Sequence, residues 1–204
     1  MRLISISAIA IASLAAAGCA GTHPVHYYTL QAAPAAMSST KADGPVIVVG
    51  AIATPEALQD GRIRYRIGPN EISAYEYHRW VERPGVMVRE SLRHALAATG
   101  HYQRVLDAGS GVSGDYLVRG KLTEFGEVDD ASGKGAIQTK IALRLELIER
   151  KTNRTIWEGN ADRADPAAGK SMKDVVQSME RNLQEAMSGA ATEIDRFLAS
   201  RHTS

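Results

Sequence analysis

The chain contains one cysteine, Cys19, within the stretch LAAAGCAGT near its N-terminus. A cysteine thiol can act as a nucleophile, form a disulfide or carry a covalent attachment. A nucleophile needs a fixed base beside it, which a terminal segment does not offer. No second cysteine is present to form a disulfide within the chain. These arguments favour Cys19 as a site of attachment.

The residues before Cys19 are organised like a secretory signal. Arg2 supplies one positive charge, residues 3–17 form a mildly apolar run, and Ala16, Ala17 and Gly18 lead into the cysteine. The run is shorter than the about 20 apolar residues of a membrane-spanning helix. The pattern resembles a bacterial lipobox, with Ala16 where leucine is more usual. It predicts a lipoprotein signal peptide at residues 1–18 and lipidation of Cys19, against two alternatives, a plain cleaved signal and an uncleaved anchor.

Lipidation at Cys19 would determine where the protein resides. Each buried methylene contributes about 0.8 kcal/mol, so several acyl chains hold a protein stably on a membrane. Ala20 follows the cysteine. By resemblance to the usual sorting rule, the absence of aspartate at this position favours the outer membrane. We therefore expect a lipid-anchored protein in the outer membrane, facing the periplasm.

Other motifs with possible chemistry are weaker. GSGVSG at residues 109–114 matches the G-x-G-x-x-G pattern, but the dinucleotide-binding version opens a helix and here a strand-like segment follows. Glu90 and His94 are four residues apart, with His101 nearby, yet a metal site needs further ligands that the sequence does not cluster there. We expect an inter-strand loop, an exposed helix face, no metal, no cofactor and no enzyme activity.

Composition limits the class of protein. About 186 residues follow the predicted signal, enough for one domain with a substantial core. The net charge is +1 with Arg2 included, and no basic stripe is interleaved with aromatic residues. This argues against a nucleic-acid partner. Residues 19–44 are expected to form the lipidated N-terminus and a linker, with a short strand near 26–31, and residues 45–200 to form the domain.

Within the domain, periodicity predicts strands and two long helices. In residues 136–150, Ile141, Leu143, Leu145 and Leu147 alternate with polar positions, the pattern of a half-buried strand. A hairpin is expected at 61–80, a helix at 83–100, and strands at 46–54, 102–106, 115–128 and 154–162. A second helix is expected at about 169–199, with apolar residues recurring at helical spacing, and we interpret it as covering one face of the sheet rather than binding a partner.

One long stretch carries a family resemblance. IRYRIGPNEISAYEYHRWVERP, preceded by YYTL and followed by an amphipathic helix and TGHYQRV, resembles the auxiliary lipoproteins of ABC-type, MCE-linked transport systems, the PqiC-like proteins. The resemblance implies an α/β sandwich with a mixed β-sheet flanked by two main helices, like the N-terminal domain of TolB. It also implies a role in moving lipids or other hydrophobic substrates between the two membranes. The ATPase and permease would be other chains.

The hairpin carries the predicted partner-binding residues. Tyrosine and tryptophan offer large contact area, and arginine can make bidentate bonds to carboxylates. For Trp80 and Tyr77, burial in the core remains an equal alternative. Strand alternation places Tyr75 and Tyr77 on one face, so we expect the two to share one environment. The predicted set is Tyr65, Arg66, Tyr75, Tyr77, Arg79 and Trp80.

We therefore expect a non-catalytic outer-membrane lipoprotein that docks on the MCE-domain channel protein of a system with an inner-membrane permease and ATPase. A homo-oligomer is possible as well. The alternative is a stand-alone lipoprotein that binds a lipid or a peptidoglycan fragment. A large apolar pocket between the sheet and the C-terminal helix would favour the alternative, and a filled core with an exposed aromatic hairpin would favour docking.

Overall fold

The computed structural model describes residues 23–31, 43–129 and 137–201. Cys19 and the predicted signal peptide lie outside the described residues, as does most of the turn expected at 129–135. The elements in chain order are β1 (His26–Tyr28), β2 (Val46–Ala53), β3 (Arg62–Ile67), β4 (Glu71–Trp80), α2 (Pro84–Ala98), β5 (Arg104–Asp107), β6 (Tyr116–Asp129), β7 (Ile137–Glu149), β8 (Arg154–Pro166) and α3 (Met172–Arg201).

All eight strands form one mixed sheet. Along one path their order is β1-β4-β3-β6-β2-β5, and β7 pairs with the other side of β6 and carries β8 beyond it. The early part of β6 pairs in parallel with β2, and its last residues pair in parallel with β3. The β3–β4, β6–β7 and β7–β8 pairs are antiparallel. β6 is therefore the strand that connects the hairpin to the rest of the sheet.

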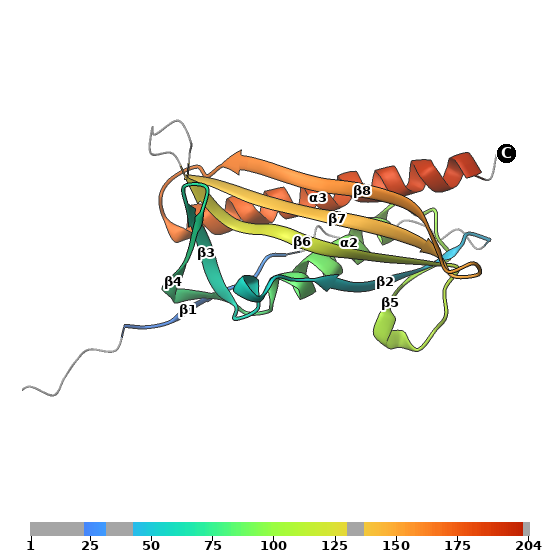
Figure 1. Ribbon diagram of the computed structural model, residues 1–204, viewed down its shortest axis with the longest axis horizontal. Coiled ribbons are helices and arrows are strands. Elements are labelled where there is room, and N and C mark those ends of the chain that lie inside the picture. The colour runs from blue at the N-terminus through green and yellow to red at the C-terminus, as the bar shows by residue number, and fades with distance from the viewer. Residues whose placement is uncertain (1–22, 32–42, 130–136, 202–204) are drawn as a thin grey trace, which may run out of the picture.

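Both helices cover the same face of this sheet. α3 packs on β7 and β8, α2 packs on β2 and β5, and the two helices contact each other. Figure 1 shows α3 running along β7 and β8 on one side of the sheet. No described helix covers the opposite face. The expectation of a mixed sheet with two main flanking helices is confirmed, as a two-layer arrangement.

The core follows the predicted alternation. Leu143, Leu145 and Leu147 are buried beneath α3, while Arg144 between them is exposed on the open face. Leu145 lies opposite Gly120 of β6 on one side and Gly159 of β8 on the other. The buried residues of α3 include Met179, Leu183, Met187 and Ile194, so this helix does cover the sheet.

α3 begins three residues later than expected because of a local cap. The Ser171 hydroxyl accepts from the Asp174 backbone N–H at 3.2 Å, and the Asp174 carboxylate accepts from the Ser171 backbone N–H at 3.1 Å. This reciprocal pair satisfies two of the donors that a helix N-terminus leaves free. A Ser-x-x-Asp signal was thus present in the sequence and marks the helix start better than the apolar spacing does.

The strand expected near 26–31 lies at His26–Tyr28 and belongs to the folded domain. β1 pairs in parallel with β4, with Tyr27 opposite Arg79 and Tyr28 opposite Trp80. Leu30 is buried, and the backbone of Gln31 is held from both sides by α3, since its N–H donates to Glu180 and its carbonyl accepts from Gln184. Part of the segment expected to be linker is therefore fastened into the sheet.

Candidate functional site

The β3–β4 hairpin is braced close to its tip. Gly68 in the turn has a φ of 65°, a conformation in which glycine avoids the strain of a side chain. The Arg66 guanidinium donates to the Pro69 carbonyl at 3.1 Å and to both carboxylate oxygens of Glu124 on β6 at 3.1 Å. Arg66, predicted to bind a partner, is thus engaged in holding the tip against β6.

Two isoleucines at this tip are exposed apolar side chains that were not among the predicted contact residues. Ile67 ends β3 and Ile72 lies near the start of β4, and their side chains are 45% and 48% exposed. They flank the turn residues on either side. The sequence did indicate this exposure, because two β-branched apolar residues flank a Gly-Pro turn. Side chains beside a protruding turn have no buried surface to pack against.

Tyr65 and Tyr75 lie together, on the part of the hairpin nearer the sheet. Their ring centroids are 4.7 Å apart. The Tyr75 hydroxyl donates to Glu127 at 2.7 Å, and the Glu127 side chain is buried. Both tyrosines are half-buried, so they support the hairpin with one part of the ring and expose another.

Trp80 belongs to the core. Its side chain is 3% exposed and packs edge-to-face against Phe125, with the centroids 5.7 Å apart. The reason is register, because Trp80 lies at the base of β4, opposite Tyr28, and its ring joins the cluster of buried residues from the sheet and both helices. We remove Trp80 from the predicted contact residues, in line with the core alternative.

Tyr75 and Tyr77 do not share an environment, and that expectation is wrong. Tyr77 stacks on His23 at 5.0 Å, whereas Tyr75 meets the ring of His78 edge-on at 5.8 Å. The cause is an irregularity in the ladder, where Arg62 opposes Arg79 but Arg64 opposes Ala74. Between these two pairs the chain advances by two residues on β3 and by five on β4. A bulge of this kind breaks the alternation of side chains between the two faces.

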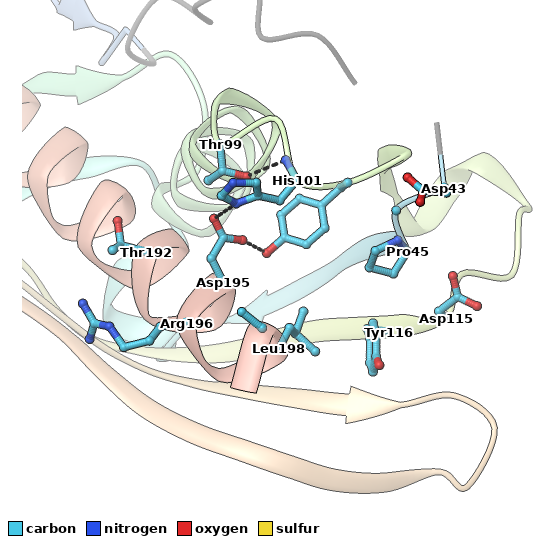
Figure 2. Close-up of a pocket in the computed structure, with 13 residues that line it drawn as sticks. Asp43, Pro45, Thr99, His101, Asp115, Tyr116, Thr192, Asp195, Arg196 and Leu198 are labelled. Carbon is cyan, nitrogen blue, oxygen red and sulfur yellow. Dashed lines mark hydrogen bonds and ion pairs between the residues drawn. The ribbon is translucent and has the colours of Figure 1, made fainter. Parts of the chain in front are cut away.

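A groove of about 1040 Å³ lies at the opposite end of the sheet from the hairpin tip. It is lined by residues that precede β2 and β6, by the segment after α2, and by the last turns of α3. Figure 2 shows His101 beside Asp195 of α3, and Tyr102 reaches the same carboxylate. The Tyr102 hydroxyl donates to one carboxylate oxygen, and His101 Nδ1 lies 2.9 Å from the other. The wall beside them carries Pro45, Tyr116 and Leu198.

Because of the Tyr102–Asp195 contact, we expect the free energy of unfolding to fall as the pH rises into the alkaline range. Tyr102 is 4% exposed, and burial together with the Asp195 carboxylate raises the pKa of its hydroxyl far above the ordinary value. Above pH 10 an unfolded tyrosine releases its proton while the folded one keeps it, so rising pH favours the unfolded state.

We expect the free energy of unfolding of the wild type to fall by about 1.4 kcal/mol per pH unit more steeply above pH 10 than that of Tyr102→Phe. Urea unfolding over a series of alkaline buffers measures both slopes. Equal slopes would show that Tyr102 ionises as readily in the folded protein as in the unfolded chain. Tyr27→Phe, whose side chain is 64% exposed, is the matched control and should keep the wild-type slope.

The residues of the other two candidate motifs form hydrogen bonds with their neighbours in the chain. Arg93 binds both Glu90 and His94, at 3.0 Å each, so the four-spaced pair is held on the surface of α2. Asp107 accepts from Gly109 in the GSGVSG segment, and a strand, β6, follows as expected. Within the described ranges, no group of three or more potential ligands is placed to hold a metal ion. The described helices also include none with the length and apolarity to cross a membrane.

Comparison with solved structures concerns the fold. A protein from Xanthomonas campestris with a known crystal structure shares 15% sequence identity with this chain. The two structures superpose with a TM-score of 0.77, and the alignment covers 88% of this chain and 100% of that one. A second, uncharacterised protein is 14% identical, with a TM-score of 0.66 and coverage of 84% and 99%. No curated protein matches the sequence.

Comparison with protein families is more informative about function. The model of the family described as "ABC-type transport auxiliary lipoprotein component" matches residues 28–191, which is most of the chain and nearly all of the described domain. The match begins within β1 and ends within α3, so it includes the hairpin, α2 and the first part of α3. The chain therefore belongs to the ABC-type transport auxiliary lipoprotein family.

Proposed function

We propose that this protein is a non-catalytic lipoprotein of the outer membrane that docks on the periplasmic MCE channel protein of an ABC-type system. The system would move lipids or other hydrophobic substrates across the cell envelope, with the permease and ATPase supplied by other chains. Family membership supports the auxiliary role. Cys19, with Ala20 after it, supports lipid anchoring at the outer membrane.

The observation that carries the docking proposal is the braced hairpin tip. Ile67 and Ile72 expose apolar surface on a segment that Arg66 fastens to Glu124. A rigid segment loses little conformational entropy on binding, and apolar side chains at the centre of an interface carry much of the affinity. Tyr65 and Tyr75 lie behind the tip and add aromatic contact area.

The double variant Ile67→Glu, Ile72→Glu tests this proposal. Two charged carboxylates in place of apolar contacts should lower affinity for the channel protein by about 100-fold, since each 1.4 kcal/mol is a factor of ten. Co-purification of the channel protein with the tagged lipoprotein measures the effect, and circular dichroism checks the fold. Val112→Glu places one such carboxylate on an exposed apolar residue of another loop and should bind normally. Undiminished co-purification of the double variant would place the interface elsewhere.

The groove at Asp195 is the observation that favours the alternative, a stand-alone binding lipoprotein. Its wall combines apolar side chains with the cation of Arg196, an arrangement suited to an amphipathic molecule. Side chains between the sheet and the helices are shielded from solvent, with Leu143, Leu145 and Met187 each at most 1% exposed. Native mass spectrometry of protein extracted from membranes discriminates the two functions, because a retained lipid would favour binding and bare protein would favour docking.

A further inference from the structure

A second exposed apolar patch lies at the base of the hairpin, away from the tip. Among the described residues, six large hydrophobic side chains are exposed, and three of them, Val25, Tyr27 and Val81, lie beside β1 and the end of β4. Their exposed fractions are 41%, 64% and 62%. The Val81 backbone N–H donates to the Tyr28 carbonyl at 2.8 Å, which places Val81 directly next to β1. We call Val25, Tyr27, Arg79 and Val81 the β1 patch.

The β1 patch also contains a cation that no described carboxylate neutralises. Arg79 is the register partner of Tyr27, so the two side chains lie on the same face of the sheet. Neither an ion pair nor a hydrogen bond of the Arg79 side chain is found within the described ranges, whereas Arg62 and Arg64 on the neighbouring strand both pair with Asp60. Just beyond Val81, the exposed side chains of Glu82 and Arg83 offset each other in charge.

The covalent distance from Cys19 to this patch is short. His23, the first described residue, is four residues after Cys19, and an extended chain spans at most about 3.5 Å per residue. His23 therefore lies within about 14 Å of the Cys19 Cα atom, whatever path the chain takes. Because β1 is fastened to β4, the segment 32–42 follows the first strand and cannot lengthen this tether.

We propose that the β1 patch lies against the phospholipid surface in which Cys19 is anchored, with Tyr27 and Val81 at the headgroup level and Arg79 bonded to lipid phosphate. The proposal rests on the lipidation of Cys19 proposed above. Amphipathic tyrosine and arginine side chains are favoured at this depth, since their apolar bodies and polar ends match the boundary. An anionic headgroup adds electrostatic attraction for an unpaired arginine.

This arrangement gives the two ends of the hairpin different partners. The base, with Arg79 and Val81, would lie at the membrane, and the tip, with Ile67 and Ile72, would be left for the channel protein. Figure 1 shows that the chain enters β1 at one corner of the molecule, while the hairpin turn lies at another, beside the β6–β7 end. A short tether at the base thus fixes which way the tip is presented.

Fluorescence quenching by brominated phospholipid tests the proposal on the full acylated protein. The protein is reconstituted in vesicles of phosphatidylethanolamine and phosphatidylglycerol, with and without bromine on the acyl chains. The additional emission of Tyr27→Trp should fall to half or less in brominated vesicles, and that of Val81→Trp likewise. Ile72→Trp, at the hairpin tip, should be unchanged. The wild type gives the background from Trp80 and Trp157.

The outcomes separate this proposal from the one it rests on. A wild type that does not float with the vesicles would overturn lipidation itself. If the wild type floats but Tyr27→Trp and Val81→Trp are quenched no more than Ile72→Trp, the membrane contact is disproved while lipidation stands. Loss of channel-protein binding in Tyr27→Glu, with no quenching in Tyr27→Trp, would instead make the β1 patch a protein interface and overturn the proposal.

Discussion

Cys19→Ser should remove the protein from the membrane fraction altogether. Serine lacks the thiol that accepts the diacylglyceryl group, so the substituted chain would carry no acyl chains. At about 0.8 kcal/mol per buried methylene, these chains outweigh any contribution of the β1 patch to membrane affinity. Metabolic labelling with palmitate and fractionation of the envelope measure the two consequences, which are absence of label and loss of membrane association.

A neighbouring substitution separates anchoring from sorting. Ala20→Asp keeps the cysteine and should keep the palmitate label, but by the sorting rule that the sequence resembles it should move the protein to the inner membrane. Ala20→Ser should behave as the wild type. Normal labelling of Cys19→Ser would rule out acylation at this residue. If Ala20→Asp stays in the outer membrane, lipidation of Cys19 still holds, but residue 20 no longer supports the outer membrane as the protein's location.

Among single truncations of the core, we expect Leu145→Ala to lower the free energy of unfolding the most. Leu145 is fully buried and lies between Gly120 and Gly159, which have no side chains to move into the space it leaves. Truncation of buried leucine costs about 2–5 kcal/mol, and the cost rises with the volume of the cavity that remains. We expect a value near the upper end, about 4 kcal/mol, against the 5–15 kcal/mol typical of a whole domain.

Urea unfolding of the two variants Leu145→Ala and Arg144→Ala makes the comparison. Arg144 is the residue of β7 just before Leu145 and is exposed on the open face, so its truncation should change the free energy of unfolding by less than about 0.5 kcal/mol. A loss of less than about 2 kcal/mol in Leu145→Ala would mean that the sheet collapses onto the cavity. The side chains that could move into the space are those of Ile52, which lies over Gly120, and Trp157, which lies over Gly159.

The local elements of this fold are predictable from the sequence. Alternation in β7 gave both the strand and its buried face, with Leu143, Leu145 and Leu147 inside. Pro84 and Gly100 bracket α2 as expected, and α3 shows its apolar spacing over the whole length. These signals are readable because they repeat every two or 3.6 residues, and they depend only on which face of one element is covered.

The hairpin shows where this reasoning fails. The strands β3 and β4 were expected. The burial of Trp80 and the different surroundings of Tyr75 and Tyr77, however, depend on the bulge and on the pairing with β1. A shift of one residue moves a side chain to the other face of the sheet, and nothing local to EISAYEYHRW specifies where the shift occurs. The contact of Tyr102 with Asp195, which are 93 residues apart, is likewise set by how α3 packs on the sheet.

By itself, the sequence determined the class of fold, the buried faces of the strands and helices, and Cys19 as the predicted anchor. Only the tertiary structure decided that His26–Tyr28 join the sheet, so that residues 20–25 rather than a long linker separate the sheet from the predicted anchor Cys19. A short strand was expected near 26–31, but three residues have too little periodicity to show which strand they pair with. Its place depends on hydrogen bonds and packing supplied by β4, some fifty residues further along the chain.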